Sequence, residues 1–166
     1  MNKRYKGSII AVDIATKTGW AIYNNGKIIK SGTWRFSIIG REKELYSKLK
    51  RTIEQYGVIQ IVAEDVYKGQ KSAYSVLYRL RNVVKKVAAT FQLPQIVYIS
   101  PIKVQRYMWG RRYGKDYNGT EKQEMIGSVK RLGYQLENDK ADDEADAIGI
   151  LITYLHNNGI PVKHPK

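Results

Sequence analysis

The sequence predicts an α/β fold in which helices flank a mixed sheet of five strands. Three observations support this class. The chain opens with an apolar, β-branched run, a turn-rich hairpin pattern follows, and strand and helix periodicities then alternate towards the C-terminus. The first three strands are expected to be antiparallel, and the fourth and fifth are expected to be parallel.

The first 36 residues have the pattern of a three-stranded meander. Residues 8–14 (SIIAVDI) form a continuous β-branched run, as expected for a strand that is buried on both faces. Two further strands are predicted over 18–23 and 27–36, on either side of an Asn24-Asn25-Gly26 turn. Such a short turn connects antiparallel neighbours.

The middle of the chain alternates between helix and strand. Residues 40–56 carry apolar side chains at intervals of four and predict a helix. Residues 58–63 (VIQIVA) predict a buried strand that ends at Glu64. A long helix is predicted over 72–91, where apolar residues mark one face, and a short fifth strand over 95–99.

The last third of the chain is expected to be helical. Ser100-Pro101 is typical of the start of a short helix, and Thr120 with Gln123 has the spacing of a capping box. Between them, residues 110–119 form a loop rich in Gly, Arg and Tyr. The final helix is predicted from about 141 to 156.

Composition favours a protein that binds a polyanion. The 166 residues suit one domain, and we expect 1–166 to be a single domain. Lys and Arg number 29 against 15 Asp and Glu, and the net charge of +14 creates a positive field suited to nucleic acid, although a merely soluble basic protein is the plainer alternative. With no cysteine, disulfides, thiolate metal sites and cysteine nucleophiles are excluded. No apolar signal region or run of ~18 apolar residues is present, so we expect a cytoplasmic protein with no membrane partner.

Carboxylates stand at the ends of apolar segments in this basic chain. Asp13 lies in the first apolar run, Glu64 ends a later one, and Asp142-Asp143-Glu144-Ala145-Asp146 opens the last helix. Buried like charges are costly unless a cation gathers them, and a divalent metal is the usual solution. The pattern therefore indicates a metal-dependent enzyme that acts on nucleic acid.

Strand order decides whether these acids meet. If the first and fourth strands are parallel neighbours, Asp13 and Glu64 emerge at the same carboxyl edge of the sheet. Asp143 and Asp146 are three residues apart and share a helix face, which we expect to point inward, whereas Asp142 is displaced from Asp143 by about 100°. The plainer interpretations are strand-end turn residues and helix N-terminal charges that favour the dipole.

Four segments resemble a known family. AVDIATKTGWAIY (11–23), IVAEDVY (61–67), GTEKQEM (119–125) and DEADAIGILITYLH (143–156) occur in the order and at the spacing of RuvC-type Holliday junction resolvases. These belong to the RNase H-like superfamily, and the chain looks like the short form found in phages. Two departures are a turn after Asp13 without the Pro-Gly usual in bacterial members and a longer, more basic loop after Met108.

The resemblance implies the roles of the acids. Asp13, Glu64, Asp143 and Asp146 would hold two Mg²⁺ ions, for which Mn²⁺ would substitute, in an RNase H-like nuclease fold. Two such ions stabilise both ends of an in-line phosphodiester displacement. Lys122 matches a lysine beside the family's active site, or is simply exposed in the first turn of a helix. Lys103 lies at the approximate position of a second family lysine.

Several residues are expected to contact DNA. Tyr67 stands where relatives carry an aromatic residue that stacks on bases at the crossover, although a core tyrosine is the rival interpretation. Basic residues near it and in the 110–119 loop are expected to contact phosphates, unless they are merely solvated. They are Lys68, Lys71, Arg111, Arg112 and Lys115.

The expected function is resolution of Holliday junctions or related branched DNA by a homodimer. A junction has near two-fold symmetry, and the 72–91 helix is the expected contact, with Tyr74, Tyr78 and Arg81 on its second face, unless that face packs on the 40–56 helix. An RNase H acting on RNA–DNA hybrids is the runner-up. An ATPase of the actin and sugar-kinase type and a catalytically silent nucleic-acid-binding relative are the remaining alternatives.

Overall fold

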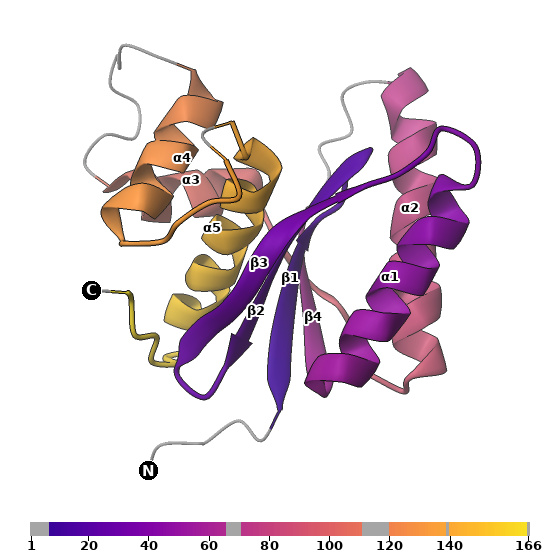
Figure 1. The fold of residues 1–166 in the computed structure, drawn as a ribbon, viewed down its shortest axis with the longest axis horizontal. Coiled ribbons are helices and arrows are strands. Elements are labelled where there is room, and N and C mark those ends of the chain that lie inside the picture. The colour runs from indigo at the N-terminus through magenta and orange to yellow at the C-terminus, as the bar shows by residue number, and fades with distance from the viewer. Residues whose placement is uncertain (1–6, 66–70, 111–119, 139, 166) are drawn as a thin grey trace.

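The computed structural model describes residues 7–65, 71–110, 120–138 and 140–165, with only the backbone of 71–74. Its sheet has the strand order β3-β2-β1-β4-β5 (Figure 1). β1 is antiparallel to β2 and parallel to β4, and β4 is parallel to β5. The predicted mixed five-stranded sheet is confirmed, and the first strand is its centre. The strands are β1 (Ser8–Asp13), β2 (Lys17–Asn24), β3 (Lys27–Arg35), β4 (Val58–Glu64) and β5 (Val97–Ile99).

The central place of β1 follows from its composition. Ile9, Ile10, Ala11 and Val12 are wholly buried, because both faces of this strand are covered. The β2–β3 hairpin turns at Asn25 and Gly26, which both have positive φ (48° and 88°), as the predicted turn requires. The predicted start of β5 at residue 95 is wrong, because pairing with β4 begins only at Val97; the Gln95 carbonyl accepts a hydrogen bond from the side chain of Gln60.

Helices cover both faces of the sheet (Figure 1). α1 (Arg41–Tyr56) and α2 (Lys71–Thr90) lie on one face, and α3 (Pro101–Trp109), α4 (Glu121–Arg131) and α5 (Asp142–Asn157) lie on the other. The capping box of Thr120 and Gln123 is present, and Ser100 caps α3 by accepting from the Lys103 backbone N–H. Among the described residues, no helix is both long and apolar enough to cross a bilayer.

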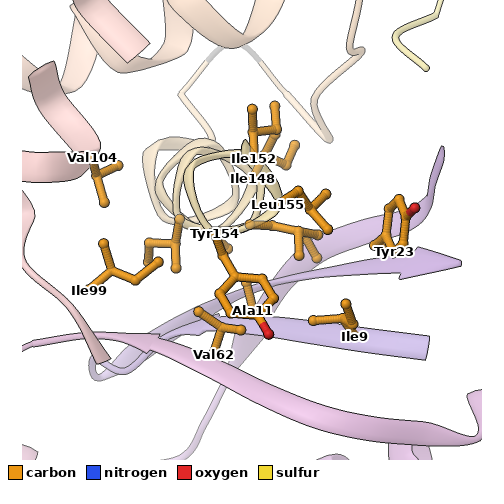
Figure 2. Packing of buried hydrophobic residues seen from close by; sticks show 14 of the residues in the cluster. Ile9, Ala11, Tyr23, Val62, Ile99, Val104, Ile148, Ile152, Tyr154 and Leu155 are labelled. Atoms are coloured by element: carbon orange, nitrogen blue, oxygen red, sulfur yellow. The ribbon is translucent and has the colours of Figure 1, made fainter. Parts of the chain in front are cut away.

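Alternation along the strands divides the core into two clusters. Ile9, Ala11, Val62 and Ile99 of the sheet pack in one cluster with Ile148 and other residues of α5 (Figure 2). The residues between them, including Ile10, Val12 and Ala63, pack against α1 and α2 on the opposite face. α5 is buried from Ala147 to Leu155, so it is a core element rather than a surface helix.

Candidate active site

Two strand ends place carboxylates side by side. In the parallel β1–β4 pair, Val12 is the partner of Ala63, so Asp13 and Glu64 follow at the carboxyl ends of neighbouring strands. Because Ala11 and Val62 face α5, alternation directs Asp13 and Glu64 to the same face. The expected meeting of these two acids is confirmed.

The start of α5 reaches this edge through a glycine. Gly19 of β2 is the register partner of Asp13. A Cβ at Gly19 would overlap the backbone carbonyl of Asp143, so only glycine allows α5 to approach this closely. The first turn of α5, with Asp143 and Asp146, is thereby held beside the end of β1.

The acids perturb one another. Burial, followed by the charges of Glu64 and Asp143, raises the pKa of Asp13 to about 8. Burial and then Asp146 raise the pKa of Glu64 to about 7, and burial and then Asp13 raise the pKa of Asp146 to about 8. Carboxylates from β1, β4 and α5 are thus close enough to influence one another's pKa and form one electrostatic cluster.

Asp142 and Asp143 differ in how far nearby cations offset their negative charge. Burial works to raise the pKa of Asp142, but its ion pair with Lys122 outweighs this effect and lowers the pKa. The pKa of Asp143 is raised, by burial first and then by Asp142, while Lys122, Lys17 and Arg35 act in the opposite direction. Asp142 is thus neutralised by a lysine, whereas Asp13 and Asp146 carry the largest shifts in the cluster.

Glu144 has a structural role that the sequence analysis missed. Its side chain is 2% exposed and accepts hydrogen bonds from the Ser31 hydroxyl (2.6 Å) and the Glu137 backbone N–H (2.7 Å). It therefore ties α5 to β3 and to the segment before the helix. Its position between two inward acids gave no separate signal, because a partner on a distant strand is not visible in the local sequence.

The donor set fits a hard divalent cation. Asp13, Glu64, Asp143 and Asp146 offer only carboxylate oxygens, the ligands that Mg²⁺ and Mn²⁺ prefer, and burial together with neighbouring carboxylates raises the pKa of each of them. Within the described residues, no group of three or more Asp, Glu or His side chains is close enough to hold a metal ion as it stands.

The remaining predicted residues lie elsewhere or outside the described part. Lys103 is exposed on α3. Arg81 contacts Asp65 (3.4 Å) and lies over the Tyr98 ring (4.3 Å), so its side chain turns towards β4 and β5 rather than outward. Tyr67, Lys68, Arg111, Arg112 and Lys115, with the side chains of Lys71 and Tyr74, lie outside the described residues.

Comparison with known proteins shows similarity in structure. No family model matches the chain, and no curated protein matches it in sequence. T. thermophilus RuvC in complex with a Holliday junction substrate is similar over 93% of this chain and 97% of that chain, with a TM-score of 0.72 and 15% identity. The fowlpox virus Holliday junction resolvase is similar over 90% of this chain and 99% of that chain, with a TM-score of 0.58 and 13% identity. The chain therefore has the RuvC-type, RNase H-like fold.

Proposed function

We propose that this chain is a metal-dependent endonuclease that resolves Holliday junctions or related branched DNA. The observation that carries this proposal is the gathering of four partly buried carboxylates from β1, β4 and α5 at one edge of a RuvC-type sheet. Of the two neighbours described above, one is RuvC in complex with a Holliday junction substrate, and the other is named as a Holliday junction resolvase. The net charge of +14 supports a nucleic-acid substrate.

Each residue of the cluster has a part in this proposal. Asp13, Glu64, Asp143 and Asp146 would hold two Mg²⁺ ions, or Mn²⁺ in their place. Such ions, when bound, lower the pKa of an attacking water and offset charge on the phosphate. Lys122 holds Asp142 in place and adds a positive charge near the cluster, where it would attract the scissile phosphate.

The substrate would be held by the residues that the sequence analysis assigned to DNA binding, some from the resemblance and the others from their positive charge. We expect Tyr67 to stack on bases at the branch point, and Lys68, Lys71, Lys103, Arg111, Arg112 and Lys115 to contact phosphates. Paired cuts on opposed strands require two active sites, so a homodimer with two-fold symmetry is part of the proposal.

Incubation with labelled substrates tests the proposal. Four-way junctions, flaps, replication forks and RNA–DNA hybrids are compared with Mg²⁺, with Mn²⁺ and with a chelator. We expect metal-dependent cutting of the four-way junction at paired positions. Faster cutting of the hybrid would favour the RNase H alternative, and binding without cutting in any metal would favour the catalytically silent one.

A further inference from the structure

Two cations face each other across the β2–β3 hairpin at the edge that carries the acids. Lys17 of β2 and Arg35 of β3 are register partners, and both are exposed. Directly paired residues of an antiparallel ladder have Cα atoms only about 5 Å apart, so both side chains can reach one ligand. Only Ile14, Ala15 and Thr16 separate Lys17 from Asp13.

Alternation places this pair on the α5 face of the sheet. Along β3, Ser31 reaches Glu144 of α5, and Arg35 is four residues further along the same face. Along β2, Ala21 packs in the α5 cluster and Gly19 lies against Asp143, so Lys17 has the same orientation. The two cations therefore lie just beyond Gly19, on the face where α5 presents its acids.

Local contacts hold the backbone that carries the pair. The buried hydroxyl of Thr18 donates to the Ala15 carbonyl (2.9 Å) and closes the turn that precedes Lys17. Trp34, next to Arg35, stacks on Trp20 with ring centroids 5.5 Å apart. The strand ends that carry the cations are thus anchored on the opposite face of the sheet.

Lys17 and Arg35 influence the acid cluster without forming an ion pair with any described residue. Both cations act on the Asp143 carboxylate, as does Lys122 from the other side. Lys122 is paired with Asp142, whereas neither Lys17 nor Arg35 forms an ion pair with any described residue. On its α4 side, the acid cluster therefore has a lysine that is already paired with an acid. On its β2–β3 side, it has two cations that form no ion pair with a described residue.

We propose that Lys17 and Arg35 together bind one backbone phosphate of a DNA strand as it leaves the acid cluster across the β2–β3 hairpin. This inference rests on the proposed function for the identity of the substrate. A strand that enters a site lined by four carboxylates is repelled by them, and a pair of cations at the exit offsets that repulsion and sets the path of the strand. Arg35 supplies a planar fork for phosphate oxygens, and Lys17 supplies a point charge.

Salt dependence of binding tests the contact. The affinity of a labelled four-way junction is measured in EDTA over a range of salt for wild type and for the Lys17→Ala/Arg35→Ala variant. The slope of log K against log salt should flatten by about 0.9, the value for one phosphate. Lys27→Ala/Lys30→Ala is the matched control, since it removes the same charge from exposed sites nearer the other end of the hairpin. An equal change of slope in both variants would show that the effect comes from net charge alone, and would overturn the proposal.

Neutral linkages locate the contact. Junctions are made with a single methylphosphonate at each of the first few linkages on either side of the branch point in each strand. One linkage should weaken wild-type binding several-fold and leave the Lys17→Ala/Arg35→Ala variant unaffected. If no linkage behaves in this way, the proposal is wrong. A wild type that binds junctions and shows this pattern but never cuts would instead contradict the proposed endonuclease, so the two failures are distinguishable.

Discussion

Gly19 of β2 lies so close to Asp143 that a side chain at position 19 would overlap the Asp143 carbonyl. This contact fixes how near the acids of α5 come to Asp13, the register partner of Gly19. The spacing within the acid cluster is therefore set by a residue with no functional group.

Replacing Gly19 with alanine should push α5 away from the sheet. We expect a loss of stability of about 1–3 kcal/mol, typical of overpacking, and a larger fall in cleavage than the loss of folded protein explains. Thermal unfolding and the cleavage rate at saturating Mg²⁺ measure the two effects. Gly32→Ala is the control, because a Cβ there meets only the edge of the Trp20 ring (3.2 Å). Full activity of Gly19→Ala would show that the spacing is not critical.

Removing any one of the four acids should separate binding from cutting. We expect Asp13→Asn, Glu64→Gln, Asp143→Asn and Asp146→Asn each to lower cleavage by orders of magnitude, because a metal ligand is lost. Junction binding should persist or tighten, because repulsion of phosphates decreases. Gel-shift and cleavage assays on the same preparations measure both. An active Asp146→Asn with an inactive Asp142→Asn would show that the wrong members of the α5 cluster were assigned.

The metal-free protein should lose stability as pH rises. The folded pKa values of Asp13 and Asp146, about 8, lie above their ordinary value of 3.8. The free-energy cost of ionising these two acids in the folded protein is therefore absent below about pH 4 and is complete above about pH 8. Asp13→Asn or Asp146→Asn should raise the melting temperature at pH 9 by about 3 °C or more, and should have little effect near pH 4. Glu54→Gln, on the exposed face of α1, is the control for a general change of charge. An equal gain at both pH values would contradict the assignment.

Binding of Mg²⁺ should release protons. With the pKa values of Asp13, Asp146 and Glu64 between about 7 and 8, part of the cluster is protonated at pH 7, and metal ligands must be ionised. Calorimetric titration in buffers with different ionisation enthalpies measures the protons released. An apparent binding enthalpy that is the same in every buffer would rule out this coupling.

The dimer prediction places α2 at the two-fold axis. Tyr78 of α2 is 52% exposed, and Tyr74 is four residues earlier on the same helix. Tyr74→Asp/Tyr78→Asp should give monomers with an unchanged circular dichroism spectrum and without paired cutting. Ile102→Asp, at an equally exposed site on α3, should remain dimeric. A wild type that light scattering finds monomeric, with DNA and without it, would exclude the dimer.

Much of the fold and of the acid cluster was predictable from local pattern. The β-branched run of Ser8–Asp13 required burial on both faces, and a central strand with a parallel neighbour brings Asp13 next to Glu64. What could not be predicted depends on contacts between distant segments. The hydrogen bond of Glu144 to Ser31 joins residues 113 positions apart.

The register of the β2–β3 ladder could not be predicted from the sequence either. The pairing of Lys17 with Arg35 depends on a register shift in the β2–β3 ladder between Ile22 and Tyr23. No local sequence pattern indicates this shift. The orientation of Arg81 was missed for the same reason. Its partners, Asp65 and Tyr98, belong to other elements, so the aromatic and cationic face of α2 looked more available than it is.

The place of α5 in the chain has a consequence for the newly made protein. Asp143 and Asp146 are synthesised after all five strands, and their helix also fills the core on one face of the sheet. A partly translated chain has Asp13 and Glu64 but neither the other two acids nor the packing that buries them. On the proposed function, a chain that is synthesised only as far as α4 has two of the four acids and should not cut DNA, and nuclease activity is expected only after α5 has been made.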